Sequence, residues 1–202
     1  MKKYVVQEVF YSLQGEGVRA GTPNVFVRFA GCNMTCKVET HGFDCDTDFS
    51  SGIRHGAALL VDRAMELVPG TAGCGVIFTG GEPALQLDPA LVEAFQERGF
   101  FCAIETNGSR KVDHLGLDWI TVSPKTAEHA LRQRTAHEVK YVRHVGQPVP
   151  NSQVEAEHYL ISPAAEPEGT ILPATLRWCI DLCKGNPPWR LSVQQHKGWC
   201  VR

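Results

Sequence analysis

Three cysteines in one short stretch are the residues of this chain best suited to do chemistry. Cys32, Cys36 and Cys45 lie within fourteen residues, with three residues between the first pair and eight between the second. Three thiolates in one loop can bind three irons of a four-iron cluster and leave the fourth iron open, whereas an electron-transfer cluster normally uses four cysteines. Zinc, with His41 as its fourth ligand, explains the same spacing equally well.

A glycine-rich turn is the second chemical signal. Gly80-Gly81-Glu82-Pro83 follows the short apolar stretch from Gly75 to Phe78. Two glycines let a ligand approach the backbone closely, and the Glu82 carboxylate offers an anion to an ammonium group. Alone, this motif is typical of an ordinary tight turn. Combined with a cysteine loop after an earlier strand, it shifts the interpretation toward an iron–sulfur site.

The elements that must position these motifs are short strands alternating with helices. We expect strands at residues 4–10, 24–30, 75–78, 101–104, 119–122, 139–142, 158–161 and 190–193, and helices at 54–67, 88–98 and 175–182. This alternation predicts an α/β fold with a mostly parallel sheet. A full eight-unit barrel needs about 250 residues, so 202 residues predict a reduced, partial (β/α) TIM-like barrel forming one domain, residues 1–202. The site then lies at the carboxyl ends of the strands.

The composition excludes several function classes. A net charge of −2 gives no electrostatic reason to expect nucleic-acid binding. The apolar runs are too short to span a membrane, and the first residues do not form a signal peptide, so we expect a cytoplasmic location. Outside the cluster loop, Cys102, Cys179 and Cys183 fit core packing better than metal binding.

The motifs together resemble one known superfamily. The chain resembles the radical S-adenosylmethionine (SAM) superfamily, and within it the 7-carboxy-7-deazaguanine synthase family. The resemblance spans nearly the whole chain, and its carriers are residues 10–17 (FYSLQGEG), 28–33 (RFAGCN), 45–49 (CDTDF), 78–83 (FTGGEP), 104–108 (IETNG), 122–125 (VSPK) and 195–197 (QHK).

The resemblance implies a reaction and its cofactors. The reaction is a lyase-type ring contraction of 6-carboxy-5,6,7,8-tetrahydropterin to 7-carboxy-7-deazaguanine, with loss of ammonia, on the route to queuosine and other 7-deazapurines. The implied cofactors are a [4Fe-4S] cluster, SAM and Mg²⁺. The implied partners are the small pterin substrate, an electron donor such as flavodoxin or ferredoxin, and a second copy of the chain in a homodimer, with no nucleic acid and no membrane.

The resemblance also assigns roles residue by residue. Cys32, Cys36 and Cys45 would hold the cluster, and Thr47 would bind Mg²⁺. The residues assigned to SAM are Gly81, Glu82, Glu105, Ser123, Pro124 and Lys125. The residues assigned to the pterin are Leu13, Gln14, Gly15, Glu16, Arg28, Thr79, His196 and Arg202, the last through its terminal carboxylate.

Chemistry supports individual assignments. A carboxylate such as Glu105 accepts two ribose hydroxyls. A guanidinium such as Arg28 binds a carboxylate in bidentate fashion, and strand alternation turns its neighbours Val27 and Phe29 to the opposite face.

The chain also departs from the common pattern. Asp44 stands where an aromatic residue often stacks on adenine, and Phe43 is the expected substitute. Ser162 stands before Pro163 where a glutamine is expected. Two rival interpretations remain: a glycyl-radical activase, which has no use for Gln14, Glu16, Arg28 and His196, and a zinc-stabilised binding module.

Overall fold

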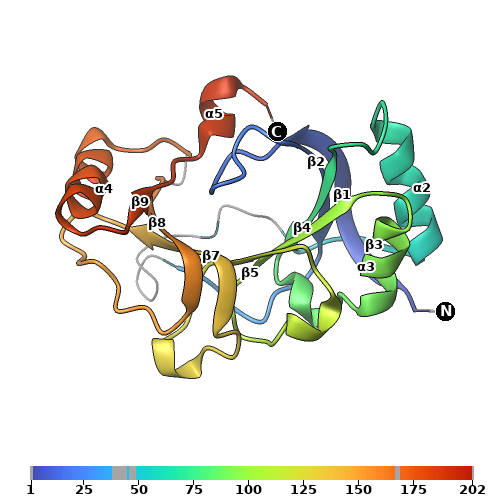
Figure 1. Ribbon diagram of the computed structural model, residues 1–202, viewed down its shortest axis with the longest axis horizontal. Helices are drawn as coiled ribbons and strands as arrows, with labels where there is room; N and C mark the ends of the chain where they lie inside the picture. Colours follow the sequence, from blue (N-terminus) through green and yellow to red (C-terminus); the bar gives the residue numbers. More distant parts are fainter. Residues whose placement is uncertain (1, 38–44, 46–48, 167–168, 202) are drawn as a thin grey trace.

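The computed structural model describes residues 2–37, 45, 49–166 and 169–201. Its centre is a curved sheet whose described strands follow the order β3-β1-β2-β4-β5-β6-β7-β8-β9 (Figure 1). The strands are β1 (Tyr4–Leu13), β2 (Pro23–Phe29), β3 (Ile53–His55), β4 (Gly75–Gly80), β5 (Phe101–Thr106), β6 (Trp119–Val122), β7 (Thr135–Arg143), β8 (Glu155–Pro163) and β9 (Arg190–Leu191).

The sheet is parallel from β2 through β9, and only β1 pairs antiparallel, with β2 on one side and β3 on the other. The described strands β3 and β9 lie at opposite edges and do not pair, so the sheet stays open. The prediction of an α/β, mostly parallel, partial barrel is therefore confirmed.

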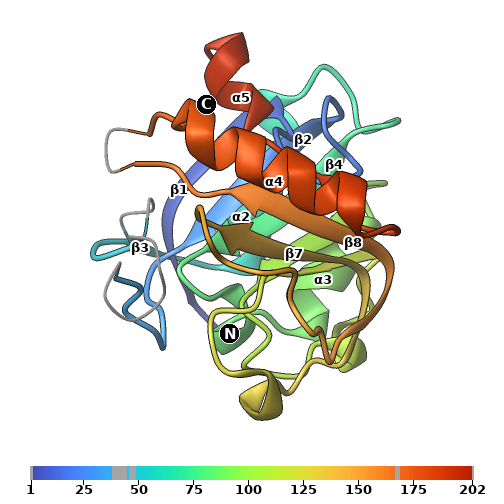
Figure 2. The ribbon, with the colours of Figure 1, turned by 90° about the vertical axis from the view of Figure 1, so that its left-hand side faces the viewer.

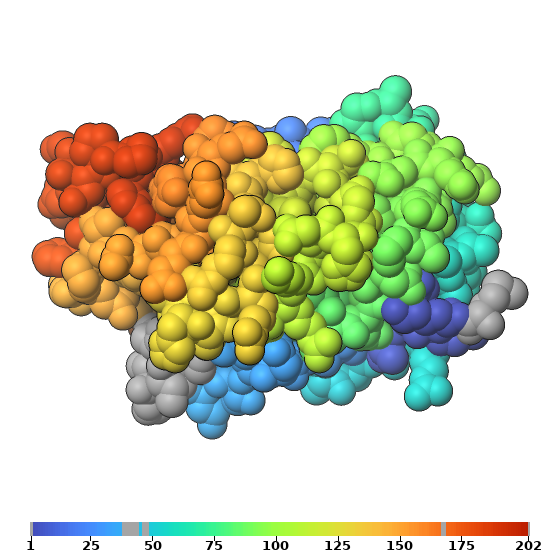
Figure 3. Space-filling model, turned by 60° about the horizontal axis from the view of Figure 1, so that its bottom comes forward, coloured from blue at the N-terminus to red at the C-terminus, as the bar shows by residue number. Residues whose placement is uncertain are grey.

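The helices cover the outer face of the sheet unevenly. Helices α2 (Ala57–Leu67) and α3 (Pro89–Gln96) pack at one end of the molecule, and α4 (Pro173–Gly185) lies at the other end (Figure 1). There α4 crosses over β8 (Figure 2). The space-filling surface shows the same separation, with the orange and red C-terminal segments opposite the green and cyan ones (Figure 3). The other helices among the described residues are η1 (Pro83–Leu85), η2 (Asp113–Leu115), η3 (Glu128–Ala130) and α5 (Gln195–Trp199).

Strand alternation divides the sheet into an apolar outer face and a polar inner face. On β7, Val139 and Tyr141 belong to the core, whereas Lys140 between them lines a cavity inside the curve of the sheet. On β2, Val27 and Phe29 are fully buried, and Arg28 lines the same cavity. The inner face is therefore where polar side chains converge.

The predicted helix at 54–67 is wrong at its start. Residues Ile53 to His55 form β3, which pairs with Tyr4 to Val6 on β1, and Gly56 then precedes α2. Pairing with a distant strand decides this boundary, and local periodicity cannot show it. The predicted start of α3 is confirmed, because Asp88 Oδ1 accepts a hydrogen bond from the Leu91 amide at 3.0 Å.

Two predictions about cysteines are confirmed: Cys102 and Cys179 are both fully buried. The predicted helix 175–182 extends to Pro173 and Gly185, and the last strand ends at Leu191 rather than Val193. Within the described residues, no helix is both long and apolar enough to cross a bilayer.

Candidate active site

One cavity of about 410 Å³ lies inside the curve of the sheet, at the carboxyl ends of the parallel strands. It collects residues from β1, β2, β4, β5 and β7, from the cysteine loop and from the segment before α5. The predicted residues that line it are Leu13, Gln14, Gly15, Glu16, Arg28, Cys32, Cys36, Cys45, Thr79, Gly81, Glu105, Ser123, Lys125 and His196. Thr47, His41, Phe43 and Arg202 lie outside the described residues.

The three cysteines of the predicted cluster loop reach this cavity together. All three are free thiols, and Cys32 and Cys36 each lie close enough to Cys45 for its charge to raise their pKa in addition to the larger effect of burial. Three thiols that line one cavity supply the donor type and number for an iron–sulfur cluster with an open iron, although within the described residues they are not gathered into a ready metal-binding group. Bound iron would hold these cysteines as thiolates.

The Gly80-Gly81 turn packs directly against the start of the cysteine loop. The amide of Gly81 donates to the Phe29 carbonyl at 3.1 Å, and the amide of Glu82 donates to the Gly31 carbonyl at 3.0 Å. A Cβ atom at Gly80 would lie 2.2 Å from the Phe29 oxygen, and one at Gly81 would lie 2.1 Å from the Gly31 oxygen. The glycines are therefore needed for contact between two chain segments, which fixes the turn relative to Cys32.

The Glu82 side chain does not reach the cavity, contrary to its predicted contact with an ammonium group. It is fully buried, and it accepts hydrogen bonds from the Thr106 hydroxyl at 2.7 Å, the Asn107 amide at 2.7 Å and the Ala84 amide at 3.0 Å. Burial raises its pKa, and these donors oppose that effect. The carboxylate thus joins the turn after β4 to the end of β5. Pro124 likewise does not line the cavity.

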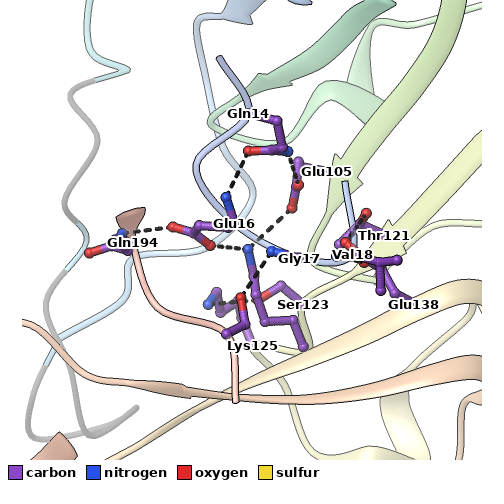
Figure 4. A network of polar contacts seen from close by, with 12 residues as sticks. Gln14, Glu16, Gly17, Val18, Glu105, Thr121, Ser123, Lys125, Glu138 and Gln194 are labelled. Carbon is purple, nitrogen blue, oxygen red and sulfur yellow. Dashed lines mark hydrogen bonds and ion pairs between the residues drawn. The ribbon is translucent and has the colours of Figure 1, made fainter. Parts of the chain in front are cut away.

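A polar network connects the loop after β1 with the sheet (Figure 4). Gln14 Nε2 donates to Glu105 Oε1 at 3.1 Å, and Gln14 Oε1 accepts from the Glu16 amide at 3.2 Å. The Lys140 ammonium group pairs with Glu16 and lies 3.5 Å from Glu105 Oε2. Gln194 Nε2 donates to the other Glu16 oxygen at 2.8 Å.

The network gives its two carboxyl groups different acidities. Burial alone would raise the pKa of Glu16, but Lys140 and Gln194 outweigh it and lower the pKa to about 2. Burial raises the pKa of Glu105 to about 7, against the opposing effect of Lys140. Burial would lower the pKa of Lys140, yet the neighbouring carboxylates raise it above its ordinary value. Lys140 and Glu16 are therefore both charged at neutral pH.

Arg28 and Thr79 occupy neighbouring strands at the same level of the cavity, since they are paired across β2 and β4. Arg28 Nε donates to Glu8 Oε1 at 2.8 Å, so the arginine is salt-bridged as well as facing the cavity. This ion pair orients the guanidinium from one side. On the far wall, Lys125 Nζ donates to Ser123 Oγ at 3.1 Å.

The C-terminal segment closes the cavity over the loop after β1. The Gln195 amide donates to the Gly15 carbonyl at 2.9 Å, and the Gly17 amide donates to Ser192 Oγ at 2.9 Å. His196 lies so close that a Cβ atom at Gly15 would be 2.0 Å from its Nδ1. Two segments far apart in sequence thus form one wall.

Two cavity residues of the network, Lys140 and Gln194, escaped the sequence analysis. So did the buried Glu138, which does not line the cavity but holds the loop after β1 by accepting a hydrogen bond from the Val18 amide at 2.8 Å. Lys140 lies inside a strand, and a lysine there is usually solvent-exposed. The only available signal was strand alternation, which places Glu138 and Lys140 on the same face of β7.

Comparison with known proteins identifies the family of this site. Residues 13–110 match a family model described as a 4Fe-4S single cluster domain. A 7-carboxy-7-deazaguanine synthase from Bradyrhizobium diazoefficiens is 40% identical over 98% of this chain and 99% of its own. The enzyme of the same name from Burkholderia multivorans is 40% identical over 96% of this chain and 97% of its own. The chain belongs to the 7-carboxy-7-deazaguanine synthase family.

A solved structure has the same fold as this chain. The crystal structure of QueE from Escherichia coli superposes with a TM-score of 0.71, covering 96% of this chain and 95% of that one at 24% identity. Membership in the family decides between the earlier interpretations. The chain is a radical SAM enzyme with an iron–sulfur cluster, and the glycyl-radical activase and the zinc-stabilised module are both rejected.

Proposed function

We propose that this cavity converts 6-carboxy-5,6,7,8-tetrahydropterin to 7-carboxy-7-deazaguanine with loss of ammonia. The names of the curated relatives support this reaction. The observation that carries the proposal is that one cavity is lined both by the three cysteines and by Gln14 and Glu16 of the loop after β1. SAM bound to the cluster and the small pterin would meet in this cavity.

Cys32, Cys36 and Cys45 would hold the [4Fe-4S] cluster. When bound, the cluster supplies one electron for cleavage of SAM, and this is the difficult chemistry of the reaction. The protein's own contribution is to hold the turn at Gly80 and Gly81 against the cysteine loop. Glu82 serves this purpose from behind the turn, as a buried acceptor of three hydrogen bonds.

The SAM subsite would lie between this turn and the ends of β5 and β6. Gly81 would offer its backbone to the methionine end of SAM. Glu105 and Ser123 would bind the ribose hydroxyls, and Lys125, hydrogen-bonded to Ser123, would add a cation nearby. Pro124 would act through the backbone only, by fixing the chain between these two side chains.

The pterin subsite would lie between the loop after β1 and the C-terminal segment. Gln14 and Glu16 would read the amino-amide edge of the pterin, with Leu13 and Gly15 shaping that loop. Arg28, beside Thr79, would bind the substrate carboxylate, and its ion pair with Glu8 keeps the guanidinium oriented. His196 would close the subsite from above, and the terminal carboxylate of Arg202 would add a contact.

Further parts of the proposal rest on the family resemblance. Thr47 would bind Mg²⁺ together with substrate oxygens, since magnesium keeps few protein ligands. The enzyme would act as a cytoplasmic homodimer of single-domain chains, residues 1–202, and would take its electron from flavodoxin or ferredoxin.

The test is an anaerobic reaction of the reconstituted enzyme with SAM, a chemical reductant, Mg²⁺ and carboxytetrahydropterin. The proposal expects a product with the mass of 7-carboxy-7-deazaguanine, formed only when all components are present. Cleavage of SAM without any pterin-derived product would contradict the assigned substrate while leaving the radical SAM chemistry intact.

A further inference from the structure

Lys140 is a buried cation that lies between the two proposed subsites. Its ammonium group pairs with Glu16 Oε2 and lies 3.5 Å from Glu105 Oε2, and its side chain is only 9% exposed. Its position on β7, between the core residues Val139 and Tyr141, directs the side chain into the cavity. No assigned role in the SAM or pterin subsite accounts for it.

The contacts around Lys140 close into a ring. From Lys140 the ring runs to Glu16, whose amide donates to Gln14 Oε1 at 3.2 Å. Gln14 Nε2 then donates to Glu105 Oε1 at 3.1 Å, and Glu105 Oε2 returns to Lys140. Each carboxylate therefore has one oxygen directed by the same ammonium group, so moving Lys140 moves both (Figure 4 shows Glu16 and Glu105 with Gln14 between them).

The charges facing Lys140 come from several elements. Glu16 from the loop after β1, Glu105 from β5 and Glu138 from β7 all act on it as carboxylates. Among cationic side chains, Arg19 acts on Glu105 and Glu138, and His196 acts on Glu16. Arg28 and Lys125 line the same cavity. Without Lys140, neighbouring carboxylates in a partly buried site would take up protons. A protonated carboxyl carries a donor where the ligand also presents donors.

We propose that Lys140 is a positioning residue for both ligands: it orients Glu105 and favours its anionic form for the ribose hydroxyls of SAM, and it holds Glu16 as an oriented anion for the amino-amide edge of the pterin. The inference rests on the proposed function, which assigns each carboxylate to one ligand. It goes further because it makes a single buried lysine, touching neither reacting centre, a requirement for both subsites.

The test measures binding to the anaerobically reconstituted enzyme rather than turnover. Radiolabelled SAM is followed by equilibrium dialysis, and 6-carboxypterin, which has the same amino-amide edge and carboxylate as the substrate, is followed by its fluorescence. Both are measured at pH 7 and pH 9 for the wild type and the variants Lys140→Met, Glu105→Gln and Glu16→Gln. Each affinity is divided by the wild-type value at the same pH, which removes the titration of the ligands themselves.

Loss of a hydrogen bond to a charged group predicts an effect of about tenfold or more. Lys140→Met should therefore weaken both probes by about tenfold at pH 7, and the deficit should shrink at pH 9 as the two carboxyl groups ionise. Glu105→Gln should weaken SAM alone and Glu16→Gln the pterin alone, and neither should recover at pH 9. A purely structural lysine would instead give the same deficit at both pH values.

Wild-type binding of both probes by Lys140→Met, or a deficit equal at both pH values, would overturn the inference. If instead Glu105→Gln and Glu16→Gln leave both probes unchanged, the subsite assignments of the proposed function fail.

Should Lys140→Met not fold, the double variant Lys140→Met with Glu16→Gln removes the buried pair together and is compared with Glu16→Gln alone. The inference expects SAM binding about tenfold weaker in the double variant at pH 7. Equal SAM affinity in the two would overturn it.

Discussion

Replacing Glu82 by glutamine tests whether the buried carboxylate holds the glycine-rich turn. Its Oε1 accepts from Ala84 and Thr106, and its Oε2 accepts from Asn107. A glutamine has one acceptor oxygen and one amide nitrogen. If the glutamine oxygen takes the place of Oε1, the side-chain NH₂ faces only the Asn107 amide, and one hydrogen bond is lost. In the reverse orientation the NH₂ faces both the Ala84 amide and the Thr106 hydroxyl, and two hydrogen bonds are lost. The first orientation is therefore preferred.

The magnitude follows from the type of bond that is lost. A hydrogen bond to a charged group contributes about 1.5–3 kcal/mol, and a buried donor left unsatisfied costs about 1–3 kcal/mol. The neutral amide avoids part of the cost of burying a charge, so we expect a net loss of about 2–3 kcal/mol in the free energy of unfolding. For a chain of this size, 1 kcal/mol corresponds to roughly 2–4 °C in Tm, which predicts a decrease of roughly 4–12 °C.

The assay is thermal unfolding of the anaerobically reconstituted enzyme, followed by circular dichroism. The matched control is Glu66→Gln, the same chemical change at an exposed position on α2. The Tm of the control should equal that of the wild type. If Glu82→Gln also melts within a degree of the wild type, the carboxylate does not hold the turn, and its role has to be sought elsewhere.

Three further predictions concern the cavity walls. Gly15→Ala should weaken 6-carboxypterin binding, because its Cβ would lie 2.0 Å from His196 Nδ1. The control Gly198→Ala, with open space around the new Cβ, should bind normally. Equal binding by the two variants would contradict the close packing of His196 on the loop after β1. Arg28→Ala should weaken 6-carboxypterin by about tenfold or more while SAM binding is kept, and unchanged pterin affinity would remove that role. Burial raises the pKa of Glu105 to about 7, so this group binds its proton more tightly in the folded state and its contribution to stability, up to roughly 3 kcal/mol, is present below pH 4.5 and lost as the pH rises through 7. Glu105→Gln should lack this decline in urea titrations of the ligand-free protein, and an unchanged pH dependence would contradict the shifted pKa.

The sequence predicted the architecture well because each motif marks the end of a strand. Glycines, cysteines and polar residues follow apolar stretches at regular intervals, and parallel strands bring those ends to one edge. The cysteine loop, the turn at Gly81 and the residues after β5 and β6 were therefore placed together correctly. The pairing of β3 with β1 could not be predicted, because it depends on contact between Ile53 and Val6, far apart in the chain.

Side-chain direction was the part of the site that local patterns could not provide. Glu82 follows two glycines in a turn, and nothing in the turn shows whether its carboxylate faces the ligand or the protein. Lys140 follows Val139 in an apolar strand, and only the curvature of the whole sheet places its ammonium group between Glu16 and Glu105. Both residues depend on tertiary packing, which overrides what their neighbours in sequence suggest.

The central claim is that Cys32, Cys36 and Cys45 together hold one four-iron cluster at the wall of the substrate cavity. Its most direct test is the iron and acid-labile sulfide content after oxygen-free reconstitution, compared between the wild type and Cys45→Ala. The account predicts about four irons and four sulfides per chain in the wild type, and a clear loss of both in the variant. Wild-type protein without bound sulfide, or a variant that retains the full cluster, would contradict it.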